Sequence, residues 1–356
     1  MDTGGQGWMD GLSGDPEIAG LFSGTALFAS FARFEQALIK GLAQAKLIGP
    51  DDAAGLIDQI AGFEPDRAAI DGALLRDGVP APDYVRQLRA LVTGPGSELV
   101  HHGATSQDLV DTATIEALGR TGAILSKRLD ALLTRLADLE NRDGGNALEA
   151  ITRMQPALGF KASDRLAAWS QPLEALRARL TKLREQTRIL QFGGAVGGLR
   201  ALGDNAAIIA ETLGRELDLR WPGHSWHAAR GPMLAHANYL SELTGALGKI
   251  GQDVALMALR GDRDIRLSGG GGSSAMPHKQ NPVAAERLVA LARLNATLVA
   301  GMHQAQIHEM ERSGAAWMLE WMILPKMCEA AGAALATASA LMGCVDRIGE
   351  PGGDGR

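Results

Sequence analysis

The sequence predicts an all-α protein built from long helices, and three observations lead to this fold class. Aromatic residues make up only 4% of the 356 residues. Period-two alternation of Val, Ile and Thr, which marks strands, is nearly absent. Ala, Leu, Arg and Glu recur instead at three- and four-residue spacing over stretches about twice the usual ~12-residue helix length or longer, which is typical of a helical bundle.

The residues before Gly94 predict shorter helices. Their helical patterns are interrupted by four turn-forming segments, which are Gly49-Pro50, Glu64-Pro65, Pro80-Ala81-Pro82 and Gly94-Pro95-Gly96. We therefore expect an N-terminal helical domain over residues 1–97. The first residues show no charged region followed by an apolar core, so no secretory signal is expected.

Residues 98–348 are expected to form a central bundle of long helices. The periodic segments cover 106–141, 156–191, 231–267, 282–309 and 317–345. One face of the second segment is predicted to be core, and its members are Leu166, Trp169, Leu173, Leu176, Leu180 and Leu183. The stretch 330–345 is too short to span a bilayer, so it indicates a tightly packed helix and no membrane contact. Residues 349–356 are expected to be a flexible tail.

The composition excludes several classes of function. The 35 basic and 41 acidic side chains give a formal charge of −6, which argues against nucleic-acid binding because phosphate contacts need a basic surplus. Cys328 and Cys344 match no zinc or redox spacing, and the histidines show no paired ligand spacing. We therefore expect no metal, no disulfide scaffold and a cytoplasmic protein.

The loop at residues 269–282, GGGGSSAMPHKQNP, is the strongest candidate for chemistry. Four consecutive glycines indicate a loop that moves or that approaches a ligand closely. Asn281 is suited to be the N-cap of the next helix and Pro282 its first residue. The positive end of that helix is therefore expected to favour an anionic substrate. A flexible linker is the alternative. A phosphate-binding P-loop fits poorly, because its glycine spacing and its preceding strand are both missing.

Three segments resemble the signature regions of the fumarase/aspartase superfamily. Residues 272–282 (GSSAMPHKQNP) match the form GSSxMPxKxNP over eleven positions. Residues 100–112 (VHHGATSQDLVDT) resemble the first region, and residues 152–157 (TRMQPA) resemble the second. Four further segments resemble the 3-carboxy-cis,cis-muconate cycloisomerase branch, namely 190–197 (LQFGGAVG), 226–230, 247–254 (LGKIGQDV) and 311–321.

This resemblance implies a fumarase/aspartase-like long helical bundle with a five-helix central domain. The superfamily assembles as a homotetramer with a twenty-helix core, in which each active site takes its three regions from three subunits. Most relatives continue into a third, smaller helical domain, so a truncated C-terminal domain is expected here. The implied activity needs no cofactor and converts a small tricarboxylate, 3-carboxy-cis,cis-muconate, to 4-carboxymuconolactone in the protocatechuate (β-ketoadipate) route of aromatic degradation.

The resemblance also implies roles for individual residues. Ser273 is expected to transfer the proton, and His101 is the catalytic histidine of the first region. Substrate binding is expected from hydroxyl, amide and cationic side chains, which are Thr105, Ser106, Thr152, Arg153, Gln155, Lys279, Asn281, Arg312 and His227. Arg153 replaces a histidine that many relatives use to protonate a leaving group. A carboxylate leaving group, with a pKa of about 4, does not need that proton.

The implied chemistry requires concentrated positive charge. These enzymes make or break a bond beta to a carboxylate, through a carbanion stabilised as an aci-carboxylate with doubled negative charge. Lys279, the backbone N–H groups of the glycine run and the following helix start suit that task. Two alternatives stay open, which are a C–N or C–O lyase such as adenylosuccinate or argininosuccinate lyase, and a catalytically silent structural oligomer.

Overall fold

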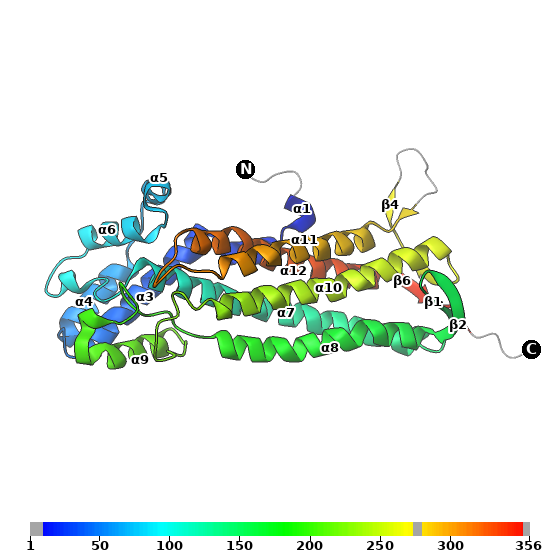
Figure 1. Cartoon of the computed structure of the whole chain (residues 1–356), viewed down its shortest axis with the longest axis horizontal. Helices are drawn as coiled ribbons and strands as arrows, with labels where there is room; N and C mark the ends of the chain where they lie inside the picture. The colour runs from blue at the N-terminus through cyan, green and yellow to red at the C-terminus, as the bar shows by residue number, and fades with distance from the viewer. Residues whose placement is uncertain (1–9, 273–279, 352–356) are drawn as a thin grey trace, which may run out of the picture.

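The computed structural model describes residues 10–272 and 280–351. Five long helices run side by side along its length (Figure 1), and they are α7 (Ser106–Asp143), α8 (Ala162–Thr187), α10 (Gly231–Arg260), α11 (Val283–Ala305) and α12 (Ala315–Gly343). This arrangement confirms the all-α class predicted from the periodicity. Within the described ranges, no helix combines the length and the apolar character that crossing a membrane requires.

The shorter helices lie mainly toward one end of the bundle (Figure 1). They are α1 (Asp10–Ser13), α2 (Pro16–Leu21), α3 (Gly24–Gln44), α4 (Pro50–Ala61), α5 (Arg67–Asp77), α6 (Ala81–Leu91) and α9 (Ala206–Glu216), with the 3₁₀ turns η1 (Ser97–Leu99) and η2 (Arg200–Asn205). Helix α4 begins at Pro50 and α6 follows Pro80, so both start at predicted turn segments. Proline is tolerated in a first helical turn because the N–H it lacks has no partner there.

Three two-stranded antiparallel sheets lie at the opposite end. They pair β1 (Ala147–Thr152) with β2 (Gln155–Lys161), β3 (Ile265–Leu267) with β6 (Val345–Ile348), and β4 (Gly271–Gly272) with β5 (Gln280–Asn281). Backbone hydrogen bonds of 2.8 and 2.9 Å join Ala147 and Glu350 in both directions. Glu350, in the predicted tail, is therefore held by the hairpin, whereas residues 352–356 lie outside the described residues.

These strands correct three predicted helix boundaries. Helix α8 begins at Ala162 and not near residue 156, because residues 155–161 pair with 147–152. Helix α10 ends at Arg260, before strand β3. Helix α11 begins at Val283 with Pro282 as its N-cap, so the prediction of Asn281 as N-cap is wrong by one residue. Asn281 is instead extended and paired with Gly271.

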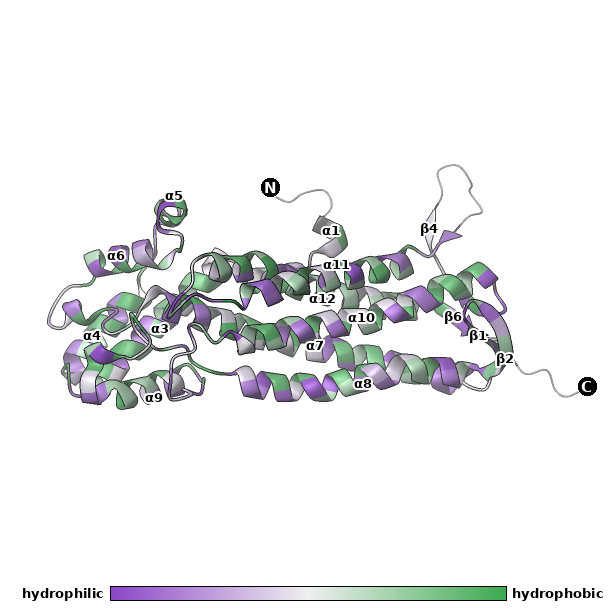
Figure 2. Ribbon diagram, in the orientation of Figure 1, coloured by the Kyte–Doolittle hydropathy of each residue, from purple (hydrophilic) through white to green (hydrophobic). Residues whose placement is uncertain are grey.

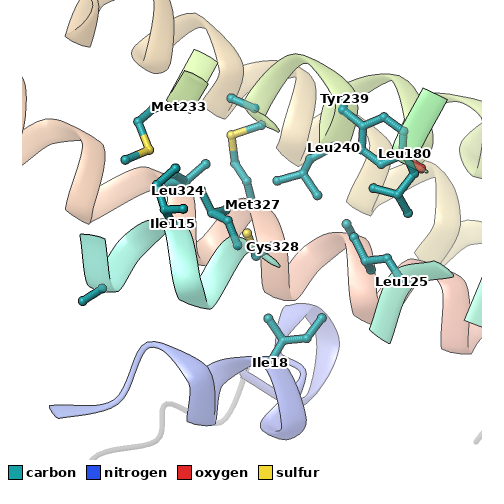
Figure 3. Close-up of a cluster of buried hydrophobic side chains, with 14 of the residues drawn as sticks. Ile18, Ile115, Leu125, Leu180, Met233, Tyr239, Leu240, Leu324, Met327 and Cys328 are labelled. Atoms are coloured by element: carbon teal, nitrogen blue, oxygen red, sulfur yellow. The ribbon is translucent and has the colours of Figure 1, made fainter. Parts of the chain in front are cut away.

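The core consists of the apolar faces of these helices (Figure 2). Five members of the predicted stripe on α8 are confirmed as core, because Leu166, Trp169, Leu173, Leu176 and Leu180 are all at most 6% exposed. The sixth, Leu183, is only partly buried against the core. Figure 3 shows side chains from α2, α7, α8, α10 and α12 converging, among them Ile18, Leu125, Leu180, Leu240 and Met327. Burial of such apolar surface is the dominant favourable contribution to folding.

A buried ion network joins α7, α10 and α12. Arg230 is 2% exposed and donates to Asp111 at 2.6 and 3.0 Å and to Glu320 at 2.9 and 2.6 Å. Burial by itself raises the pKa of Asp111, but the charge and hydrogen bonds of Arg230 outweigh it, so the net pKa lies below its usual range. The buried pair therefore stays ionised and sets the alignment of these helices beside the N-terminus of α7.

His236, on α10, makes the stability of the fold depend on pH. Its side chain is buried with Nε2 2.7 Å from Thr187 Oγ1, and burial lowers its pKa from 6.5 to about 4. As the pH falls below about 6.5, His236 becomes protonated in the unfolded chain. In the folded chain the same residue stays neutral until about pH 4. The neutral ring therefore stabilises the fold at pH 7, and up to ~3 kcal/mol of that stability is lost across this window.

We expect His236→Gln to flatten this pH dependence. Urea unfolding of the variant between pH 6.5 and 4 is predicted to lose less stability than the wild-type protein loses, because glutamine does not titrate. His303→Gln is the matched control, since His303 is exposed. The same steep decline in His236→Gln as in the wild type contradicts this account.

Candidate active site

The first cluster of predicted site residues lies where α7 begins, and we call it the histidine end. His101, Thr105 and Ser106 line a cavity of about 440 Å³ there. Arg312, from the loop between α11 and α12, donates from Nη1 to Thr105 Oγ1 at 2.7 Å. The fold thus brings Thr105 and Arg312 together across 207 positions of sequence. The remaining lining residues are Ala81, Pro82, Val85, Arg86, Arg89 and Ala104.

Thr105 is held in place as the N-cap of α7. Its backbone N–H donates to Asp108 Oδ2 at 2.9 Å, as part of a capping box. Capping at this point leaves the Thr105 hydroxyl in contact with Arg312. The positive end of the α7 dipole therefore lies beside a permanently charged guanidinium, which is an arrangement suited to a carboxylate.

The Asp108 carboxylate is fully buried and accepts three further hydrogen bonds. They come from the backbone N–H of Gly193 at 2.9 Å, the N–H of Gly194 at 3.0 Å and His227 Nε2 at 2.8 Å. Gly194 has φ +67°, and a Cβ there would lie 2.6 Å from the Gly103 carbonyl oxygen, so the close approach requires glycine. These donors compensate the buried charge and fix the start of α7.

His101 is held by Glu35, which lies on α3. His101 Nδ1 is 2.6 Å from Glu35 Oε1, and the His101 backbone N–H donates to Glu35 Oε2 at 3.0 Å. Glu35 is fully buried, whereas 11% of the His101 side chain is exposed. His101 also has φ +61°, a left-handed conformation that costs a non-glycine residue about 1–2 kcal/mol. The two bonds to Glu35 hold the histidine in this strained position.

The second cluster lies at the tip of the β1–β2 hairpin, and we call it the hairpin end. Thr152 and Gln155 pair across a two-residue turn formed by Arg153 and Met154. Both turn residues have positive φ, 47° and 65°, as in a type I′ turn, where Gly and Asn are preferred. All four residues are exposed. Strand β5, which contains Asn281, lies toward the same end, as the β4 label in Figure 1 shows.

Helix α7 separates the two ends. It has 38 residues, which at 1.5 Å per residue span about 57 Å. Thr105 precedes its first residue, and the hairpin follows shortly after its last. A single copy of the chain therefore cannot bring His101 and Gln155 to the same small molecule.

Two predicted residues, Ser273 and Lys279, lie outside the described residues. The neighbouring Gly272 and Gln280 pair as β4 and β5. In the described part of the chain, no three His, Cys, Asp or Glu side chains are grouped as a metal site requires.

A second cavity, of about 280 Å³, lies among α3, α7 and α12. Most of its lining is apolar, including Leu27, Phe28 and Leu324. Its Arg33 is already paired with Glu116 at 2.5 Å. None of the predicted site residues that the structure describes lines this cavity.

Comparison with known proteins decides the family. A family model described as Lyase matches residues 90–296. A protein of Bradyrhizobium diazoefficiens named 3-carboxy-cis,cis-muconate cycloisomerase is 37% identical over 327 residues, which cover 89% of this chain and 69% of the relative. The chain belongs to the fumarase/aspartase superfamily.

Solved structures of the superfamily have the same fold. The 3-carboxy-cis,cis-muconate lactonizing enzyme of Pseudomonas putida is 30% identical, with a TM-score of 0.88 over 96% of this chain and 77% of its own. A fumarate lyase from Mesorhizobium sp. BNC1 is 28% identical, with a TM-score of 0.86 over 94% of this chain and 76% of its own. The histidine end and the hairpin end thus belong to a superfamily fold that covers nearly the whole chain.

His227, which was predicted to bind substrate, is buried next to Asp108. It is 2% exposed and does not line the cavity of the histidine end. Its Nε2 donates to Asp108, and its buried Nδ1 makes no hydrogen bond with the described residues. From this setting we expect His227 to support Thr105 through Asp108.

We expect His227→Leu to lower the free energy of unfolding by about 1.5–3 kcal/mol, because it removes one donor from a buried carboxylate. His227→Gln keeps a donor near the same place and is expected to restore most of the loss. Urea unfolding measures both effects. A His227→Leu protein of wild-type stability with a raised KM contradicts this view and returns His227 to substrate binding.

Neither Glu35 nor Asp108 is among the residues predicted from the superfamily motifs. Glu35 does carry a signal, because it interrupts an apolar helical face between Phe31 and Ile39. A carboxylate on a core face needs a buried partner. The sequence does not show that this partner is His101, 66 positions away.

Proposed function

We propose that this chain is a 3-carboxy-cis,cis-muconate cycloisomerase, which lactonises its substrate to 4-carboxymuconolactone. The observation that carries the proposal is the Arg312–Thr105 pair beside His101 at the α7 N-terminus. It occurs in a chain 37% identical to a protein named for this reaction. Permanent positive charge, a hydroxyl and a helix start suit a substrate with three carboxylates.

The proposed reaction is an intramolecular addition. An oxygen of one substrate carboxylate forms a C–O bond to the alkene carbon beta to another carboxylate. The alkene electron pair moves toward that second carboxylate and gives the aci form, which Arg312 and Lys279 are proposed to stabilise. A proton then adds to the alpha carbon, and we assign its delivery to Ser273.

The reaction fits the groups that the chain supplies. Substrate and product are isomers apart from the proton taken up, so no oxidant or reductant takes part. The two cysteines are unpaired, which suits the reducing cytoplasm that we propose as its location. Arg153, at the exposed hairpin tip, is proposed to bind a further carboxylate.

The active site is proposed to be completed by other copies of the chain in a homotetramer. The supporting observation is that the two ends lie about 57 Å apart along α7. The hairpin also exposes apolar side chains, with Met154 70% and Leu158 77% exposed. Contact with another copy would cover them and would bring Thr152, Arg153 and Gln155 to a histidine end.

An ultraviolet assay tests the proposed function, because lactonisation removes the conjugated diene. The wild-type protein is expected to consume 3-carboxy-cis,cis-muconate and to leave adenylosuccinate and argininosuccinate unchanged. Turnover of either succinyl adduct in its place supports a C–N lyase. Turnover of none of them supports a silent oligomer, and either outcome overturns the proposal.

Replacing Arg312 is expected to lower kcat/KM by about 10–100-fold. This loss corresponds to the removal of one charge-assisted hydrogen bond, which contributes ~1.5–3 kcal/mol. Steady-state kinetics of Arg312→Ala measure it. Arg177→Ala is the matched control, since Arg177 is an exposed arginine paired with Asp130 on the bundle surface. Equal kinetics in the two variants would remove Arg312 from the site.

A further inference from the structure

Glu35 is a charged residue in an apolar environment. It is fully buried on α3 among Phe31, Phe34, Leu38 and Ile39, each at most 1% exposed. Burying a carboxylate costs several kcal/mol unless it is paired and hydrogen-bonded. An apolar side chain here would complete the core face of α3 without that cost. The carboxylate therefore calls for an explanation beyond packing.

Both oxygens of Glu35 are bound by one residue. Oε1 lies 2.6 Å from His101 Nδ1, and Oε2 accepts the His101 backbone N–H at 3.0 Å. A carboxylate oxygen accepts, so the ring proton is on Nδ1 in the neutral form. None of the residues that the structure describes hydrogen-bonds Nε2, and His101 lines the 440 Å³ cavity. The carboxylate thus fixes the tautomer, the ring orientation and the strained backbone of His101 together.

The other ionisable groups near this pair do not supply a second negative charge to the His101 ring. Tyr84, on α6, stays neutral because burial and then the charge of Glu35 raise its pKa. Arg89 donates to the Val100 carbonyl at 2.9 and 3.1 Å, and Arg86 is paired with Asp83. Among the described residues, Glu35 is thus the carboxylate that compensates positive charge on the His101 ring.

We propose that Glu35 is a positioning residue that makes His101 Nε2 the proton carrier of the histidine end. The inference rests on the proposed function. The proton donor gives its proton to the substrate carbon. The His101 imidazolium then transfers its Nε2 proton to that donor, so the donor is protonated again and the ring becomes neutral. The neutral ring then regains a proton from water. Glu35 remains a carboxylate throughout and stabilises the imidazolium, as the aspartate of a Ser-His-Asp triad does.

The kinetic test compares Glu35→Gln with Glu116→Gln. Glu116 also links α3 to α7, through Ser30 and Arg33, but does not contact His101. Glu35→Gln is expected to lower kcat at least about tenfold, with KM within about twofold. The pH profile of kcat is expected to differ from that of the wild-type protein, because the variant removes the negative charge that faces the ring. Glu116→Gln is expected to leave that profile unchanged.

A double-mutant cycle and a substrate-free measurement complete the test. In a His101→Asn background, Glu35→Gln is expected to have no further effect on kcat. Nitrogen-15 spectra of histidine-labelled protein without substrate are expected to show His101 as the Nδ1–H tautomer, lost in Glu35→Gln. These spectra test the pair even if the muconate assay shows that the proposed function is wrong.

Unchanged kcat, pH profile and His101 nitrogen signals in Glu35→Gln overturn the proposal. Additive effects of the two substitutions also overturn it, because Glu35 would then act independently of His101. If Glu35→Gln does not fold, Glu35→Asp serves instead. It keeps the charge but withdraws it by one methylene, so a partial loss of kcat with a wild-type pH profile is expected.

Discussion

Replacing Ser273 with alanine is expected to lower kcat on 3-carboxy-cis,cis-muconate by about 10²–10⁴-fold, with little change in KM. The size of the effect follows from the assigned role, since a group that delivers a proton in the transition state contributes to kcat and not to ground-state binding. Steady-state kinetics and a thermal unfolding scan of the same sample separate lost chemistry from lost folding.

A serine hydroxyl can do this only in a positive environment. Its alkoxide is ordinarily far too basic to form at neutral pH, so nearby cations and backbone N–H groups have to stabilise it. Ser274→Ala is the matched control, because it removes the adjacent hydroxyl of the same glycine-rich loop. Full turnover in Ser273→Ala, or an equal loss in both variants, contradicts the assignment.

The long helices were predictable from sequence because each keeps a continuous apolar face. The predicted stripe on α8 shows this, since helical spacing alone placed the members from Leu166 to Leu180 in the core and left only Leu183 partly exposed. The short strands were not predictable. Strand β5 has two residues, which is too few for any alternation to appear, and its pairing displaced the predicted cap at Asn281.

The candidate site was predictable only where motif residues act directly. Thr105 and Arg312 came from separate motifs, and the fold joins them by a hydrogen bond. The supporting residues were harder to predict because their function depends on distant partners. Asp108 fixes the α7 start through Gly193, Gly194 and His227, and Glu35 meets His101 across the packing of the shorter helices.

The second large prediction concerns whether the histidine end and the hairpin end of one active site come from different copies of the chain. Two inactive variants are expected to regain activity when their chains share one oligomer. His101→Asn damages only the histidine end, and the double variant Thr152→Ala/Gln155→Ala damages only the hairpin end. If each site takes these ends from different copies, random assembly of equal amounts gives about a quarter of the sites two intact ends.

The matched control for this experiment pairs two variants with damage at the same end. His101 and Arg312 both belong to the histidine end, where Arg312 contacts Thr105. Oligomers that mix His101→Asn and Arg312→Ala chains always place at least one substitution in each histidine end. Their activity is expected to remain no higher than the mean of the two parent variants.

The most direct test of the account is therefore the turnover of hybrid oligomers, co-expressed with two different affinity tags and purified through both. For His101→Asn with Thr152→Ala/Gln155→Ala, we predict about a quarter of the wild-type kcat per chain, far above either parent variant. Hybrids as inactive as their parents, at wild-type oligomer size, would show that one chain supplies both ends and would contradict the shared site.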